Sequence, residues 1–411
     1  MRKFLYILPI VAMFLGFSAC SSDDDEVVRH TLTVNVTLPD EINSKASEAA
    51  QSDLFVTAFN TSTSESKTAS IKDNVAKIEL VPGTYNLTVS GEVMSFIVNG
   101  VETDVDVFAN KTVNIDLVAA KASPLIFKEV YFSGVKDFYF QDAFYEIYNN
   151  SDEVQYLDGV IMGIVDFGFA PDSSDKSLPS VWMTNGKYSD GRYPLTSHVQ
   201  CFPGTGKDYP IQPRTSIVVA ANPMDHSSRQ LAEADDPSPV NLTNAQWQLY
   251  VEGGFPADTK MGNAEPMKFL WKTWGREMMP ATDGQPIVLA RLKDIDPAVY
   301  AAEASTLAPV PGGTNKCFMI PADCIIDAID IVSSDPSLHN KRIEAKDDAG
   351  MTWFTGANGG DGAYSGKSLR RKVTGFTSTG KAILKDTNNS NNDFVTGGST
   401  PTPGVMPNVV D

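Results

Sequence analysis

Apolar and polar residues alternate along short segments in the first third of the chain. The clearest run is 30–38, where leucine and valine occupy every second position and threonine or asparagine fills most of the positions between them. A period of two is typical of a β-strand with one face on a core and one face in water. The pattern returns between turn residues at 54–59, 75–80, 85–93 and 112–117. This spacing predicts a β-sandwich of about seven strands over residues 30–120.

The turn between two of these strands carries a more specific pattern. Residues 80–89 read Leu-Val-Pro-Gly-Thr-Tyr-Asn-Leu-Thr-Val. Proline sets φ at a turn, and we expect Gly83 to take a positive φ. The stretch resembles the turn of transthyretin-like sandwiches of the carboxypeptidase-regulatory type. That resemblance implies a non-catalytic spacer or binding domain.

A second β-rich region follows a small, polar boundary at 119–124. Apolar segments at 125–132, 144–149 and 160–165 are each followed by glycine, asparagine or aspartate within a few residues, which predicts further strands. Long helical periodicity is nearly absent. One short helix is expected in 297–307, because Asp296 can cap it and proline suits the first helical position. The chain is therefore predicted to be all-β with little helix.

Several segments of this second region follow one another in a recognisable order: 126–131, 145–159, 213–221, 325–330, 368–371, 386–394 and 401–404. Together they resemble a bacterial lamin-tail domain, an immunoglobulin-like sandwich. The resemblance implies that residues 121–404 form one such domain, followed by a tail at 405–411, and it supplies no catalytic residues. An immunoglobulin-type sandwich needs only about 100 residues. The excess predicts large insertions near 166–210 and 223–316, with a functional role or a fold of their own.

The chain begins with basic residues and an apolar run that leads to a cysteine. Arg2 and Lys3 precede the apolar run 4–17, which is too short to cross a bilayer and is typical of a secretory signal peptide, here 1–19. The segment resembles a bacterial lipoprotein signal, in which the thiol of Cys20 receives a diacylglycerol and the freed amine a further acyl chain. An ordinary signal peptide that ends near a cysteine is the alternative.

An acidic leader follows this cysteine. It consists of Ser22, Asp23, Asp24, Asp25 and Glu26. It resembles the lipoprotein export signal of Bacteroides-type bacteria, which implies an anchored protein on the outer face of the outer membrane. The same composition is typical of a disordered, solvated tether over 20–29, and both interpretations can hold together.

The charge of the chain narrows the range of partners. The formal net charge at pH 7 is −18, and no basic patch stands out. Such a field repels phosphate backbones, so we expect no nucleic-acid binding. It also disfavours adhesion to anionic lipid surfaces, so the membrane contact should depend on the acyl chains alone.

Residues for catalysis are not apparent. The four histidines have neither the spacing of a metal-binding helix nor a neighbouring nucleophile motif. We therefore expect no enzymatic activity. A surface hydrolase with a site formed by the insertions remains an alternative, as does a structural spacer or adhesin.

Two weaker chemical features concern structure and metal binding. Cys317 and Cys324 are close in sequence and pass through an oxidising compartment, so they form either a disulfide or two reduced buried thiols.

Asp386, Asn388 and Asp393 are oxygen donors that calcium could use, although their spacing departs from an EF-hand. The alternative is a turn in which these side chains bond to their own backbone. We expect no other cofactor.

Aromatic residues of the second insertion are the candidates for ligand binding. They are Trp247, Tyr250, Trp271 and Trp274. They could form a platform for sugar rings or for the side chains of a partner, or they could fill the core of the insertion. The sequence thus predicts a surface lipoprotein that acts as a non-catalytic binding or accessory module. Its partner would be a glycan, an extracellular polymer or an outer-membrane protein.

Overall fold

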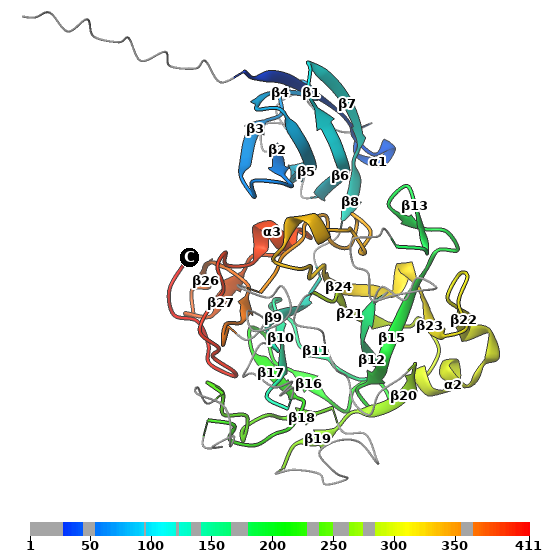
Figure 1. Ribbon diagram of the computed structural model, residues 1–411. Coiled ribbons are helices and arrows are strands. Elements are labelled where there is room, and N and C mark those ends of the chain that lie inside the picture. Colours follow the sequence, from blue (N-terminus) through cyan, green and yellow to red (C-terminus); the bar gives the residue numbers. More distant parts are fainter. Residues whose placement is uncertain are drawn as a thin grey trace, which may run out of the picture.

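The computed structural model confirms that the protein is all-β with little helix. It describes residues 28–43, 54–93, 96–120, 123–132, 141–165, 180–227, 238–249, 263–273, 284–354 and 365–411. Two β-sandwiches follow one another along the chain, an N-terminal sandwich and a larger one that we call the body, residues 123–411 (Figure 1). Within the described ranges no helix is long and apolar enough to cross a membrane.

The N-terminal sandwich packs a three-stranded sheet, β4-β1-β7, on a five-stranded sheet, β3-β2-β5-β6-β8. The alternation in the sequence sets the faces, because Leu32, Val34 and Val36 point into the core while the polar residues between them do not. The elements are β1 (His30–Thr37), α1 (Asp40–Asn43), β2 (Phe55–Asn60), β3 (Ser66–Ser70), β4 (Val75–Leu80), β5 (Gly83–Val93), β6 (Phe96–Val107), β7 (Lys111–Asp116) and β8 (Val118–Ala120).

The turn before β5 differs from its prediction in one respect. Gly83 is not among the residues with positive φ, so that expectation was wrong. A Cβ atom at position 83 would lie 2.8 Å from the side-chain nitrogen of Asn60, so glycine is required by close packing instead. The buried Tyr85 hydroxyl donates a hydrogen bond to the Val81 carbonyl at 2.8 Å and fixes the turn.

The body consists of two facing sheets. One has the order β19-β18-β17-β10-β9-β25, and the other has the order β22-β23-β15-β12-β21-β24 with β20 also paired to β15. Their strands are β9 (Leu125–Tyr131), β10 (Phe144–Asn149), β12 (Val160–Val165), β15 (Arg192–Cys201), β17 (Ser216–Ala220), β18 (Trp247–Gln248), β19 (Glu265–Pro266), β20 (Lys268–Lys272), β21 (Ile287–Arg291), β22 (Leu307–Pro309), β23 (Lys316–Pro321), β24 (Ile325–Ile329) and β25 (Leu369–Arg370).

Small elements complete the body. Three two-stranded sheets pair β11 (Gln155–Tyr156) with β16 (Pro210–Ile211), β13 (Met183–Thr184) with β14 (Lys187–Tyr188), and β26 (Val373–Phe376) with β27 (Ala382–Leu384). The helices are α2 (Pro297–Ala302) and α3 (Ser390–Asp393). The helix expected after Asp296 is confirmed, since this carboxylate accepts hydrogen bonds from the backbone N–H groups of Ala298 and Val299.

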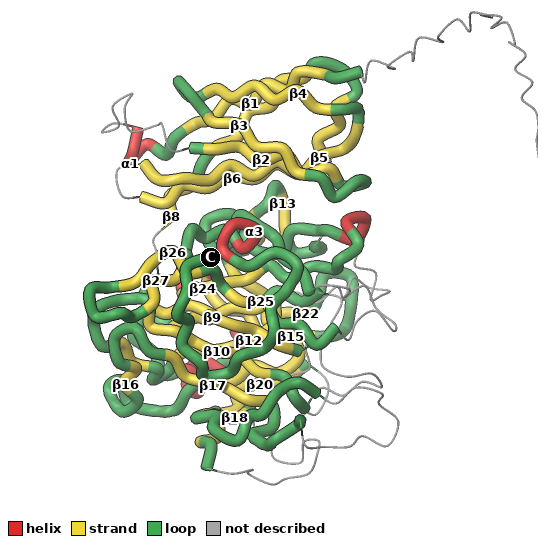
Figure 2. The backbone as a smooth tube through the Cα atoms, turned by 90° about the vertical axis from the view of Figure 1, so that its left-hand side faces the viewer, coloured by secondary structure: helices red, strands yellow, loops and turns green. Residues whose placement is uncertain are grey.

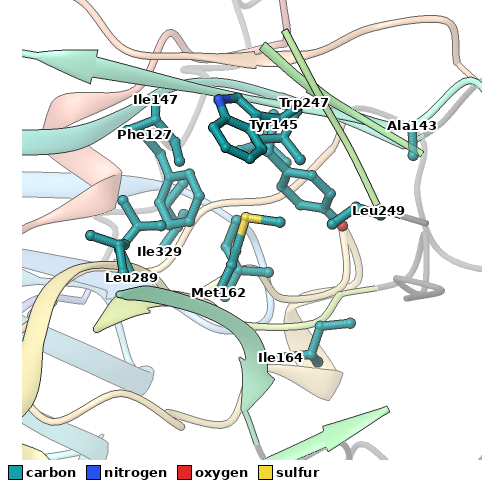
Figure 3. Close-up of a cluster of buried hydrophobic side chains, with 14 of the residues drawn as sticks. Phe127, Ala143, Tyr145, Ile147, Met162, Ile164, Trp247, Leu249, Leu289 and Ile329 are labelled. Atoms are coloured by element: carbon teal, nitrogen blue, oxygen red, sulfur yellow. The ribbon is translucent and has the colours of Figure 1, made fainter. Parts of the chain in front are cut away.

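The main apolar core lies between the two sheets of the body. Phe127 and Ile147 come from one sheet, and Met162, Leu289 and Ile329 come from the facing sheet (Figure 3). Both stretches predicted as insertions contribute to these sheets, with β15 from 166–210 and β21 from 223–316 in central positions. These stretches therefore complete the sandwich. Both strands are buried on both faces, which removes the alternation by which a half-buried strand is recognised.

Candidate functional site

A buried ionic cluster joins four segments of the body around Arg371. Its side chain is 2% exposed, and the guanidinium lies 3.1 Å from the Asp327 carboxylate, 3.2 Å from Asp386 and 3.3 Å from Asp393. It also donates to the Phe127 carbonyl at 2.9 Å. Burial raises the pKa of the Asp327 carboxyl, and the neighbouring guanidinium opposes this rise. The cluster fastens β9 and β24 to the C-terminal segment.

The candidate calcium ligands belong to this cluster. The Asp393 carboxylate accepts hydrogen bonds from the backbone and the hydroxyl of Thr387, and the Asn388 amide donates to the Lys346 carbonyl. Across the described ranges there is no group of three or more His, Cys, Asp or Glu side chains that could hold a metal ion. These contacts favour the alternative interpretation of Asp386, Asn388 and Asp393, a turn held by side-chain hydrogen bonds, with a guanidinium that supplies the positive charge between the two carboxylates.

A second buried cluster lies on β9 and β10. The ladder shifts register so that Glu146 pairs with Glu129 and Ile147 with Phe127, and Lys128 is the extra residue of a bulge. Lys128 Nζ lies 2.7 Å from a Glu146 oxygen, and both side chains are at most 1% exposed. The bulge thus brings one ammonium group and one carboxylate together inside the body.

The C-terminal segment covers this second cluster. The backbone N–H of Thr402 donates to Glu129 at 3.1 Å, that of Gly404 donates to Glu146 at 3.1 Å, and Lys128 donates to the Val405 carbonyl at 2.8 Å. The segments at 126–131, 325–330, 368–371, 386–394 and 401–404 therefore meet in two structural clusters, and these motifs hold the body together. The signal for the second cluster was present in the sequence, as Lys128 and Glu129 interrupt an otherwise apolar strand.

The four candidate aromatic residues have different positions. Trp247 is 4% exposed and packs edge-on against the rings of Phe202 and Tyr209, each at 4.9 Å, so it belongs to the core of the body. Of the two interpretations of this residue, the structure supports core filling, because the large ring on a short strand occupies space between the sheets (Figure 3). Trp271 is half-buried on β20. Tyr250 and Trp274 lie outside the described residues.

Apolar side chains remain exposed where α2 lies against β20. Phe269 is 41% exposed, Ile295 38% and Val299 57%. The half-buried rings of Trp271 and Tyr300 both pack on the buried Phe318, with centroids 6.4 Å and 5.8 Å away. The register of β20 against β15 skips Leu270, so Trp271 pairs with Val199 and Phe269 pairs with Gln200, and the two rings lie on opposite faces of β20. Trp271 lies on the face that α2 covers, whereas Phe269 lies beside His198 on the other face. We call the exposed and half-buried apolar residues on the two sides of this strand the β20–α2 surface: Phe269, Trp271, Ile295, Val299 and Tyr300.

The predicted disulfide is not formed. Cys317, Cys324 and Cys201 are buried, and none of the three takes part in a disulfide. Cys317 packs beside Val310, whereas Cys324 belongs to the cluster that contains the next residue along β23, Phe318. Because successive strand residues point to opposite faces, the two sulfur atoms lie on different sides of this sheet.

The two sandwiches meet through the outer face of the five-stranded N-terminal sheet. The Asn99 side chain donates to the Thr387 carbonyl at 2.9 Å, and the Asn392 side chain donates to the Ser90 hydroxyl at 2.9 Å. These contacts place α3 beneath β5 and β6, as both backbone views show (Figures 1 and 2). We call this contact region the junction.

Cys20 and the acidic leader residues Ser22, Asp23, Asp24, Asp25 and Glu26 lie outside the described residues. The lipid anchor and the export signal therefore stay predictions.

The fold defines an all-β protein of two joined sandwiches. Residues 212–401, most of the body, match the family model described as "Protein of unknown function (DUF4876)". This part of the chain therefore carries the pattern of the DUF4876 family. No curated protein matches the chain.

Two solved structures extend this comparison. A DUF4876 family protein from Bacteroides thetaiotaomicron VPI-5482 has a TM-score of 0.55 and 24% sequence identity, and the match covers 93% of this chain and 99% of that chain. This likeness supports the fold. A protein from Bacteroides ovatus ATCC 8483 described as a "putative adhesin" has a TM-score of 0.19 and 8% identity, over 68% of this chain and 85% of that chain. A TM-score this low supports no conclusion about the present chain.

Proposed function

We propose that this protein is a lipid-anchored, non-catalytic binding module of the outer bacterial surface, and that the β20–α2 surface is its recognition face. The proposed ligand is an extracellular glycan. Binding to an outer-membrane protein instead of a glycan would contradict this choice of ligand.

The observation that carries this proposal is the exposure of aromatic and aliphatic side chains on β20 and α2. Phe269 exposes 41% of its surface on one face of β20, and Val299 exposes 57% on the helix that lies at the other face, beside Trp271. Aromatic faces supply a flat apolar area that stacks on sugar rings, and indole also offers a hydrogen-bond donor.

The arrangement of the two sandwiches supports surface display. The N-terminal sandwich contacts the body through β2, β5 and β6, so the sheet that contains β1 faces away from the body. In both backbone views β1 lies at one end of the molecule and β20 at the other (Figures 1 and 2). An anchor at Cys20, shortly before β1, would therefore leave the β20–α2 surface far from the membrane.

The state of the buried carboxylates supports a non-catalytic role. The carboxylates of Glu129, Glu146 and Asp393 accept hydrogen bonds from hydroxyl and backbone N–H groups of the body. General acid–base chemistry on a sugar needs a carboxyl that reaches the substrate. These carboxyls instead hold chain segments in place.

A glycan array followed by equilibrium titration tests the proposal. We expect binding to a subset of glycans and a loss of about fivefold in affinity for Phe269→Ala, because stacking contacts contribute on the order of 1 kcal/mol. The matched control is Phe108→Ala, since Phe108 is 63% exposed but belongs to the N-terminal sandwich. Equal losses for both variants, or no glycan bound with an outer-membrane protein captured instead, would contradict the glycan assignment.

A further inference from the structure

An imidazole and two aromatic rings form a three-ring cluster at the junction, in which the Phe59 and Trp353 rings also contact each other at 6.0 Å. The ring of His339 is 5.7 Å from that of Phe59, at an interplanar angle of 20°, and 5.3 Å from that of Trp353, at 39°. Phe59 belongs to β2 of the N-terminal sandwich, whereas His339 and Trp353 belong to loops of the body. The stack is therefore a contact between the two sandwiches.

The hydrogen bonds of His339 define the tautomer of its neutral form. Nε2 lies 2.8 Å from the Ser333 carbonyl, which can only accept, so the ring hydrogen is on Nε2. Nδ1 is buried and has no hydrogen-bond partner. A proton added to Nδ1 would therefore introduce both a charge and an unsatisfied donor into a contact from which water is largely excluded.

The charged groups around His339 do not offset this cost. The carboxylates that act on it are those of Asp330 and Asp335, and Asp330 is already paired with Lys341 at 2.6 Å. From the N-terminal sandwich the ring meets the uncharged side chain of Phe59. Aromatic faces stabilise a cation somewhat, yet burial is the larger effect and holds the pKa of His339 below its ordinary value.

We infer that His339 makes the junction sensitive to acid, such that protonation of its ring separates the N-terminal sandwich from the body. Among the described residues, two hydrogen bonds at the junction, Asn99 with Thr387 and Asn392 with Ser90, join neutral groups. These two bonds do not titrate, whereas the imidazole of the aromatic cluster does.

The direction of the pH effect follows from the linkage between protonation of His339 and opening of the junction. A histidine whose pKa is depressed in the closed form stabilises that form fully above the pKa of the open form, and this stabilisation is lost as pH falls through that value. Each unit of difference between the open and closed pKa values changes the ratio of open to closed molecules tenfold. An anchored protein would thereby loosen the body from its base in an acidic environment.

Small-angle X-ray scattering of the protein between about pH 7.5 and about pH 5, the range in which histidine titrates, tests this inference. We expect the maximum dimension to increase on acidification in the wild type and to stay constant in His339→Gln, whose amide can still donate to Ser333 and carries no charge. His30→Gln is the matched control, because His30 lies on β1 away from the junction, and it should behave as the wild type does. Phe59→Ala should open the junction already at neutral pH.

Three results would overturn the inference. The first is a constant maximum dimension in the wild type while the His339 resonance titrates by nuclear magnetic resonance. The second is opening of His339→Gln to the same extent as the wild type. The third is a measured His339 pKa at or above the ordinary value of a histidine.

Discussion

The N-terminal sandwich and the body achieve the same kind of architecture by different means. The N-terminal sandwich has an apolar core in which Leu32, Val34 and Leu87 are fully buried, and its strands alternate between core and solvent. The body buries two ionic clusters, around Arg371 and around Lys128, in addition to its apolar core. Alternating strands specify their own faces locally, whereas the body depends on residues far apart in the sequence.

The largest expected effect is a loss of stability in the body. Arg371→Ala leaves the carboxylates of Asp327, Asp386 and Asp393 buried without their cation, and it should lower the free energy of unfolding by about 3–5 kcal/mol. Denaturant titration measures this. The control is Lys293→Ala, because the Lys293–Asp323 pair is 67% exposed on both sides and should change the stability little. Equal effects of the two variants would contradict the structural role of the cluster.

A cavity in the N-terminal sandwich gives the corresponding test of the other region. Leu32→Ala removes a fully buried side chain from β1 and should cost about 3 kcal/mol. The loss should appear in the unfolding transition of the N-terminal sandwich, observed by hydrogen exchange of its strands. Val75→Ala, on the outer face of β4, should change little. A loss of protection that is confined to the strands of the body would contradict the assignment of Leu32 to a separate core in the N-terminal sandwich.

The second ionic cluster predicts a pH dependence. Burial raises the pKa of the Glu129 carboxyl above its ordinary value, with Ser368 and Lys128 opposing the rise. A carboxyl with a raised pKa favours folding below the unfolded pKa, and this advantage is lost as pH rises through the folded value. Glu129→Gln cannot ionise, so its stability relative to the wild type should increase from about pH 4 to about pH 7. A relative stability that falls over this range would contradict the stated cause.

A smaller effect concerns the element that supports the β20–α2 surface. Asp296→Ala removes the cap of α2 and should destabilise the protein by about 1 kcal/mol, because two backbone N–H groups lose their acceptor. Asp296→Asn keeps an acceptor oxygen and should retain most of the stability. If the two variants are equally destabilised in thermal unfolding, the cap does not hold α2 in place.

The contrast between the two regions also explains what the sequence could predict. Alternation gave the strands of the N-terminal sandwich and their faces, and a cap with a proline gave the position of α2. The alternation of apolar and polar residues could not predict β15 or β21, because a strand that is buried on both faces does not show this alternation. The positive φ expected at Gly83 failed because the constraint there is a neighbouring side chain, Asn60, which is distant in sequence.

The candidate site was predictable only in part. The second insertion does contain a partly exposed aromatic residue, Trp271, but Trp247 in the same insertion lies in the core. Exposure depends on which elements pack over a residue, and the identity of the residue does not determine it. For the same reason the spacing of Cys317 and Cys324 could not show that they face opposite sides of a sheet, and the oxygen spacing at 386–393 could not show that Arg371 lies among the carboxylates.

The most direct test of the central claim, that recognition resides on the β20–α2 surface of the body, is a titration calorimetry comparison with a glycan selected on an array. The account predicts that Phe269→Ala weakens binding about fivefold while unfolding as the wild type does, and that Phe108→Ala binds unchanged. Unchanged binding by a folded Phe269→Ala variant, together with unchanged binding after substitution of Val299, would contradict it.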